Sequence, residues 1–120
     1  DVLSICCPAT KETKDLINKE SLEHFPKGAV ITNVARGDII DDEALIDALD
    51  RRKIYAVGLD VYKGEPNLNP GYLKHKSTFI LPHLGSATKD TRLAMANLAI
   101  NNLEDFFSSG TCKNIVNEKN

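Results

Sequence analysis

The sequence predicts an α/β protein, specifically the carboxyl half of a doubly wound parallel sheet that ends in a long helix. Short apolar runs alternate with helical patterns, in the order strand, helix, strand, helix, strand, strand, helix. The third apolar run, residues 55–59, is nearly continuous, which is typical of a parallel strand covered on both faces. Because right-handed crossovers cover both faces of a sheet only where its winding reverses, we expect a preceding half outside these 120 residues.

The expected strands span residues 2–5, 29–33, 55–59 and 78–81. A short helix is expected over residues 18–25, with Asn18 as its N-cap and Pro26-Lys27-Gly28 as its end. A second helix should follow Asp41, whose side chain can accept a hydrogen bond from the first helical turn. Its buried stripe is expected to consist of Leu45, Ala48 and Leu49.

The last helix should begin after Thr88 and stop at Gly110. Apolar residues step along it by three and four, which predicts a narrow stripe that belongs to a core. The stripe consists of Leu93, Ala96, Ile100, Leu103 and Phe107. Between the third and fourth strands, residues 63–76 form a Pro- and Gly-containing loop that is long enough to indicate a functional excursion.

Composition excludes several classes of protein. The formal net charge of −2 and the absence of a basic stripe argue against nucleic acid or an anionic membrane as a partner. No apolar run reaches membrane-spanning length, and the amino terminus lacks the pattern of a secretion signal. The three cysteines lack the spacing of a disulfide framework or a zinc site, so we expect no metal and a reducing, cytoplasmic setting. The first residue is not methionine, and the chain reads as a segment of a longer protein.

Polar side chains follow the ends of three successive strands. Arg36 follows the second strand, Asp60 and Glu65 follow the third, and His83 follows the fourth. If the strands are parallel neighbours, these residues share one rim of the sheet, where open α/β sheets bind ligands. A planar guanidinium suits a substrate carboxylate. An imidazole titrates near neutrality, and a nearby acid can shift its pKa.

The same residues also have structural interpretations. Arg36 could pair with Asp38 or Asp41 on the surface. Asp60 could cap a turn, and Glu65 could be an ordinary acid of the loop. The two other histidines are expected to face solvent, because neither ends a strand nor has an acid at a useful spacing. They are His24 and His75.

These blocks together make the chain resemble the D-isomer-specific 2-hydroxyacid dehydrogenases, and within them the C-terminal portion of a glyoxylate or hydroxypyruvate reductase. The resemblance covers nearly the whole chain and rests on five blocks in order. They are Pro8-x-Thr10-x-x-Thr13, Lys27-Gly28, Asn33-x-x-Arg36-Gly37, Gly58-Leu59-Asp60-Val61 with Glu65-Pro66, and Pro82-His83-x-Gly85. Thr32 departs from the family pattern, which usually has a larger apolar residue there; this affects packing and leaves the site unchanged.

The resemblance implies a Rossmann-type domain, a set of catalytic residues and a dinucleotide cofactor, NAD or NADP. Arg36 would hold the substrate carboxylate, His83 would be the general acid in reduction, and Glu65 would keep the imidazole oriented. Asp60 would contact the nicotinamide end of the cofactor. The remaining cofactor contacts would come from Cys7, Pro8, Val34, Ala35, Leu84, Gly85 and Ser86, together with Arg36 and His83.

The implied activity is hydride transfer from NAD(P)H to a small 2-keto acid, such as glyoxylate or hydroxypyruvate, to give a D-2-hydroxy acid. Residues 1–87 would be the second half of the cofactor domain, and residues 88–120 would be a long helix and tail that return toward the substrate domain. The longer protein that contains this chain, called the parent below, would be a homodimer. The family's G-x-G-x-x-G turn does not occur in this sequence, so the chain by itself is expected to be inactive.

Two further readings remain open at this stage. One is a non-catalytic, nucleotide-sensing corepressor-like homologue, which would share the fold and could retain all three catalytic residues. The other is a stable fragment without activity. Within the enzyme class, the related phosphoglycerate and lactate dehydrogenases share all three residues, so the substrate stays open. Formate dehydrogenases are disfavoured, because they resemble this pattern with a glutamine at the position of Glu65.

Overall fold

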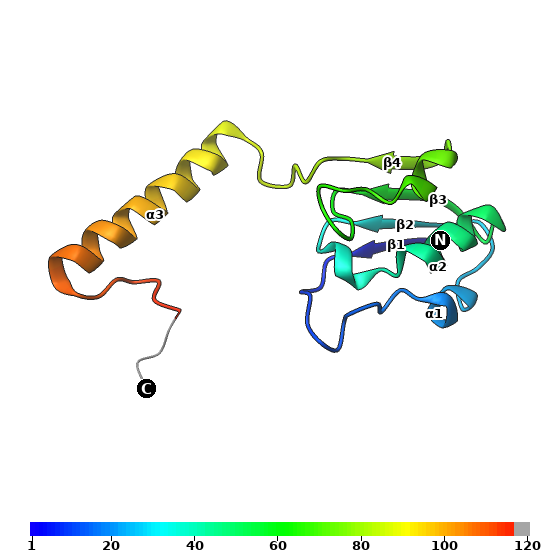
Figure 1. Ribbon diagram of the computed structural model, residues 1–120, viewed down its shortest axis with the longest axis horizontal. Helices are drawn as coiled ribbons and strands as arrows, with labels where there is room; N and C mark the ends of the chain where they lie inside the picture. Colours follow the sequence, from blue (N-terminus) through cyan, green and yellow to red (C-terminus); the bar gives the residue numbers. More distant parts are fainter. Residues whose placement is uncertain (117–120) are drawn as a thin grey trace. The chain divides into compact units, whose positions relative to one another are not determined.

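A computed structural model describes residues 1–116 of the chain (Figure 1). Contacts divide the chain into two compact units, the first spanning Asp1–Gly85 and the second starting at Ser86. The first unit contains a four-stranded sheet, and the second is built on one long helix. The α/β class and the predicted order of the elements are confirmed.

The sheet consists of β1 (Val2–Ile5), β2 (Ala29–Asn33), β3 (Ile54–Leu59) and β4 (Thr78–Ile80). All neighbouring strands pair in parallel and lie in the order β1-β2-β3-β4, so the four arrows of Figure 1 point the same way. The carboxyl ends of all four strands therefore meet at one edge, which is the condition for a shared rim.

Two helices connect the first three strands, and each begins at the predicted cap. In α1 (Lys19–Glu23) the Asn18 side chain accepts from the Ser21 N–H at 3.0 Å, and the Ser21 hydroxyl accepts from the Asn18 N–H at 2.9 Å. The helix is shorter than residues 18–25 and ends at Glu23. In α2 (Asp42–Asp50) the Asp41 side chain accepts from the Ala44 N–H at 3.3 Å.

One face of the sheet carries the core of the first unit. Along β2, Ala29, Ile31 and Asn33 are buried, while the alternate residues are partly exposed. The helix α2 packs against both α1 and β3, and it contributes the predicted Leu45, Ala48 and Leu49 as well as Ile46. Both helices thus cover the same face, as expected when two successive crossovers advance in one direction.

The expectation that β3 is covered on both faces is wrong for this structure. Phe79, which pairs with Gly58 of β3, is 66% exposed, and Val2 on β1 is 72% exposed. Residues 1–85 contain no element that packs on this second face of the sheet, because both crossover helices lie on the other one.

The excursion between β3 and β4 contains a 3-10 helix, η2 (Pro70–Lys74), that the sequence did not predict. Its Tyr72 is fully buried, and the Tyr72 hydroxyl donates to Asp42 Oδ1 at 2.8 Å. Burial and the neighbouring Asp42 raise the pKa of Tyr72, so the phenol stays protonated and keeps this hydrogen bond. The excursion is thereby fixed against α2.

The prediction for His24 is confirmed, because this residue is exposed, whereas the prediction for His75 is wrong. The His75 side chain is only 15% exposed, and its Nε2 lies 3.4 Å from Asp50 Oδ1. The η2 turn folds the excursion back toward the end of α2, so Asp50 becomes a neighbour although 25 positions separate the two residues in sequence.

The second unit contains α3 (Lys89–Ser109), which begins and ends as predicted. The Thr88 side chain accepts from the Thr91 N–H at 3.2 Å, and Gly110 takes a left-handed conformation with a φ of 75°. The expectation that its apolar stripe is core is wrong, because no residue of α3 is buried. Among residues 86–116, α3 is the only helix or strand, and a lone helix has no surface to pack its stripe against. Within residues 1–116, no helix combines the length and apolar character needed to cross a bilayer.

We predict that the 120-residue chain self-associates. Within residues 1–116, strand β1 pairs only with β2, so one edge of β1 is unpaired, and the uncovered sheet face exposes Val2 and Phe79. Unpaired strand edges and contiguous apolar surfaces drive association. Light scattering on the purified chain over a range of concentrations tests this, and a monomer at every concentration would contradict it.

Candidate active site

The rim at the carboxyl ends of the strands begins with a rigid bend after β2. Asn33, the last residue of β2, is fully buried, and its Oδ1 accepts from the Ala35 N–H at 3.0 Å. Its Nδ2 donates to the Arg36 carbonyl at 2.8 Å. Burying an amide is favourable only when it is hydrogen-bonded, so these two contacts fix the path of residues 34–36. Sequence reasoning missed this role; the available signal was a polar amide at the end of an apolar strand.

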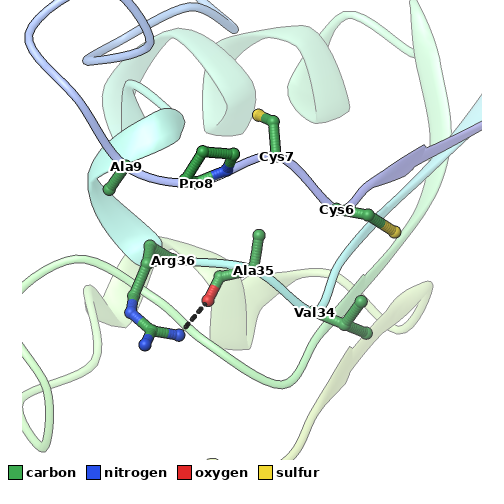
Figure 2. A pocket seen from close by; sticks show the side chains of 7 residues that line it. All are labelled: Cys6, Cys7, Pro8, Ala9, Val34, Ala35 and Arg36. Carbon is green, nitrogen blue, oxygen red and sulfur yellow. Dashed lines mark hydrogen bonds between the residues drawn. The ribbon is translucent and has the colours of Figure 1, made fainter. Parts of the chain in front are cut away.

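Arg36 extends from this bend as an exposed side chain. Its Nη1 donates to the Ala35 carbonyl at 2.7 Å, which bends the guanidinium back beside its own backbone (Figure 2). Within residues 1–116 it forms no ion pair with Asp38 or Asp41, so the alternative of a surface pair is wrong. The guanidinium keeps donors that can bind an anion.

A cavity of ≈ 530 Å³ opens between the segments that follow β1 and β2. Figure 2 shows these two segments facing each other, with Arg36 at one end. The lining residues are Cys6, Cys7, Pro8, Ala9, Val34, Ala35 and Arg36. Five of them are positions that the resemblance assigns to the cofactor, and Cys6 and Ala9 are additions. All except Arg36 are small or of moderate size, which leaves room for an extended ligand at the carboxyl ends of the strands.

Asp60 holds the turn that carries His83. The Asp60 carbonyl accepts from the His83 N–H at 2.9 Å. Its carboxylate accepts from the next two backbone N–H groups, Leu84 at 2.6 Å and Gly85 at 2.9 Å. Three successive amides are thus bound by one residue that is 8% exposed. The turn-capping interpretation of Asp60 is confirmed, and its contact with a cofactor stays a prediction.

His83 lies against Glu65 as expected. The His83 Nδ1 is 2.8 Å from Glu65 Oε2, and Glu65 Oε1 accepts from the Tyr62 N–H at 3.0 Å. Partial burial raises the pKa of Glu65, but the hydrogen bonds from His83 and the Tyr62 N–H outweigh it, and the pKa lies below the usual carboxyl value. Glu65 is therefore an anion at neutral pH. The contact orients the ring through Nδ1 and leaves Nε2 for a reacting group.

Gly37 connects the Arg36 bend with the loop of Glu65. A Cβ built on Gly37 would overlap the carbonyl of Tyr62 and the amide of Lys63, so only glycine permits this close approach. The peptide that Gly37 approaches follows the Tyr62 N–H that binds Glu65. The bend after β2 and the loop after β3 are therefore one packed unit, which holds Arg36 and Glu65 at the same rim.

We predict that Gly37→Ala costs about 1–3 kcal/mol of unfolding free energy, the usual range for overpacking a tight contact. Gly58→Ala is the matched control, because a Cβ there would lie 3.4 Å from Thr32 Cγ2, an ordinary contact. Thermal or urea unfolding of both variants measures the difference. Equal stability of the two variants would contradict the account of Gly37.

The structure places the predicted residues in three groups. Glu65 and His83 are in direct contact, and Arg36 lies on the same rim beside the cavity. Leu84 and Gly85 are held by Asp60. Ser86 begins the second unit, and its contact with a cofactor stays a prediction. Among residues 1–116, no three His, Cys, Asp or Glu side chains gather in a way that could hold a metal ion.

The arrangement defines the class of the protein: a nucleotide-binding type of α/β fold, with a histidine–carboxylate contact at the carboxyl ends of its parallel strands. Residues 1–85 match the family described as D-isomer specific 2-hydroxyacid dehydrogenase, NAD binding domain. The chain belongs to this family, whose domain binds a nicotinamide dinucleotide.

Relatives and solved structures agree with this assignment. The chain is 41% identical over 107 residues to a glycerate dehydrogenase of Hyphomicrobium methylovorum, covering 89% of this chain and 33% of the relative. It is 40% identical over 118 residues to a glyoxylate/hydroxypyruvate reductase B of Enterobacter sp., covering 98% and 36%. The crystal structure of a glyoxylate reductase from Paecilomyes thermophila superposes with a TM-score of 0.86 at 38% identity, covering 97% of this chain and 35% of that one. The chain thus spans about a third of the length of these proteins.

Proposed function

We propose that this chain carries the catalytic residues of an NAD(P)-dependent reductase of small 2-keto acids. The observation that carries the proposal is the contact between Glu65 and His83 on the same rim as Arg36 and the cavity after β1 and β2. An acid–base group, a residue that orients it and a cation for the substrate are the parts that this reaction needs. Two of the relatives are named glycerate dehydrogenase and glyoxylate/hydroxypyruvate reductase, which makes keto acids of two or three carbons the first to test, while others are named for 2-ketogluconate and 4-methyl-2-oxopentanoate.

In the proposed reaction, Arg36 binds the substrate carboxylate and places the keto carbon at the cavity. His83 donates a proton from Nε2 to the keto oxygen as negative charge builds there, and in oxidation it accepts that proton back. Glu65 fixes the ring through Nδ1 and stabilises the imidazolium. A bound nicotinamide dinucleotide would supply the hydride. Its holding residues would be Cys7, Pro8, Val34, Ala35, Arg36, Asp60, His83, Leu84, Gly85 and Ser86.

The proposal is tested on the full-length protein that contains this chain. Oxidation of NADH and of NADPH is followed with glyoxylate and with hydroxypyruvate as substrates, against a blank without keto acid. We expect turnover that depends on the keto acid, with one of the two cofactors preferred. Binding of dinucleotide without turnover of either substrate would favour the nucleotide-sensing alternative. The homodimer and the cytoplasmic setting of the parent stay predictions.

We predict that Glu65→Gln shifts the pH profile of reduction toward lower pH. Because the pKa of Glu65 is lowered, its carboxylate is charged at neutral pH, and it loses its charge only as the pH falls through its own depressed pKa. Replacing this anion by a neutral amide removes the charge that faces the imidazolium in its 2.8 Å contact, so the rate of reduction should decline at a lower pH than in the native enzyme. The measurement is kcat/KM for keto-acid reduction as a function of pH.

Glu20→Gln, an exposed position on α1, serves as the control and should leave the profile in place. An unchanged profile in Glu65→Gln would remove Glu65 from the proposed mechanism.

A further inference from the structure

A second hollow lies at the opposite edge of the sheet, where the strands begin. Its volume is ≈ 400 Å³. We call it the amino-edge hollow, and it is lined by Lys27, Gly28, Leu49, Arg52, Ile54, Tyr55, His75 and Ser77. The catalytic rim is formed by the carboxyl ends of the same parallel strands, so the hollow is separate from the proposed active site.

Three segments build the amino-edge hollow, each of which directly precedes a strand. The Gly28 N–H donates to the Lys53 carbonyl at 2.9 Å, which joins the segment before β2 to the segment before β3. The Val57 N–H donates to the Ser77 carbonyl at 3.0 Å, which joins β3 to the segment before β4. Because backbone hydrogen bonds fix these segments, the side chains around the hollow are carried by a rigid frame.

Two cationic side chains at the hollow, Lys27 and Arg52, form no ion pair within residues 1–116. The adjacent Arg51 and Lys53, by contrast, both pair with Glu23. Asp50 is the acid beside His75, with a side chain 64% exposed to solvent. Two permanent cations thus face one partly screened carboxylate, and the balance favours an anion.

Two residues of the frame are unusual in burial or conformation. Within residues 1–116, the buried Nε2 of His75 has no hydrogen-bond partner, and Asp50 Oδ1 at 3.4 Å does not satisfy it. Buried polar atoms are nearly always paired, but this atom is closed to solvent, so it can meet a ligand only if the ring turns toward the hollow. Arg52 holds a φ of 55° because it lies in the turn that ends α2, where its N–H donates to the Leu49 carbonyl at 3.0 Å and the Lys53 N–H donates to the Ala48 carbonyl at 2.9 Å.

The floor of the hollow is apolar. Leu49 and Ile54 are buried beneath it, and Tyr55 presents an aromatic ring that is largely exposed. We propose that the amino-edge hollow is a second ligand site, which binds an anionic group carried on a small apolar body. Lys27 and Arg52 bind the anion, His75 and Ser77 supply hydrogen bonds, and the apolar body covers Leu49, Ile54 and Tyr55.

The test is a titration of the 120-residue chain with phenyl phosphate, at concentrations below those at which light scattering detects association, followed by the backbone amide signals in nitrogen–proton NMR. We expect saturable shifts at the amides of Gly28, Lys53 and Ser77, with little change after the carboxyl ends of the strands. Inorganic phosphate should bind more weakly, because it lacks the apolar body. NADH should not compete, because its proposed site lies at the other edge.

Variants decide whether the named residues form the site. Arg52→Gly should not lower the melting temperature, because glycine takes a positive φ freely, yet it should weaken phenyl phosphate binding about tenfold or more. Lys27→Ala should weaken binding in the same direction. Lys76→Ala removes a nearby exposed cation that does not line the hollow, and binding should be retained.

Several results would overturn the proposal. They are the lack of saturable shifts at the hollow, equal binding by Arg52→Gly and the native chain, and equal binding of inorganic phosphate and phenyl phosphate. Because none of these measurements depends on turnover, the ligand site and the proposed reductase activity can fail independently.

Discussion

Replacing His83 by alanine should lower kcat for keto-acid reduction by roughly two to four powers of ten, the usual contribution of a positioned acid–base group. The structure gives His83 one orienting partner, Glu65, and a backbone held by Asp60. Alanine retains the backbone hydrogen bond to Asp60 but has no proton to donate to the keto oxygen. The loss should therefore fall on kcat, while the affinity for dinucleotide changes little.

The measurement is steady-state oxidation of the reduced cofactor by the full-length parent, with cofactor binding measured separately by fluorescence. His24→Ala is the matched control, because His24 is an exposed histidine at the end of α1, beside the amino end of β1 and not at the rim, and it should keep full activity. A parent enzyme that is indifferent to His83→Ala would refute the proposed mechanism.

Replacing Arg36 by alanine should cost about 3 kcal/mol or more in transition-state binding, because it removes a charge-assisted, bidentate contact to the substrate carboxylate. Expressed as kcat/KM for the keto acid, this is a decrease of roughly a hundredfold or more. The Ala35 carbonyl loses its hydrogen bond with the guanidinium at the same time, but Asn33 still fixes the bend through two backbone contacts. The fold of the rim should therefore be preserved.

Arg36→Lys separates charge from geometry. Lysine keeps a cation at the site but lacks the planar fork, so it should recover only part of the loss. Unfolding curves of both variants check that the bend is intact. If kcat/KM for the keto acid did not change in Arg36→Ala, the substrate carboxylate would have to bind elsewhere.

The residues that support the proposed site lie in the loops that follow the strands. Asn33, Gly37 and Asp60 each follow or end a strand, and each fixes backbone by contacts to neighbouring loops. The catalytic side chains themselves are partly or fully exposed, and their positions depend on this backbone. Rigid support beneath an accessible reactive group is the common arrangement in active sites.

Much of the local structure could be predicted from the sequence alone. The caps Asn18, Asp41 and Thr88, the stop at Gly110 and the four strands are as predicted, because caps, glycine conformations and apolar runs depend on residues close in sequence. The order of Arg36, Glu65 and His83 along the chain also indicated one rim, because parallel strands bring their carboxyl ends together.

Only the tertiary structure decided the contacts between loops. It showed that Asp60 binds three amides of the His83 turn, that Gly37 lies against the Tyr62 peptide, and that His75 is largely buried beside Asp50. It also showed that, within residues 1–116, no element packs on one face of β3 or on the apolar stripe of α3. An apolar pattern records that a residue favours burial, whereas the burial itself depends on which elements pack there. The local pattern is a property of neighbouring residues, and the contacts that complete a site join residues far apart in the chain.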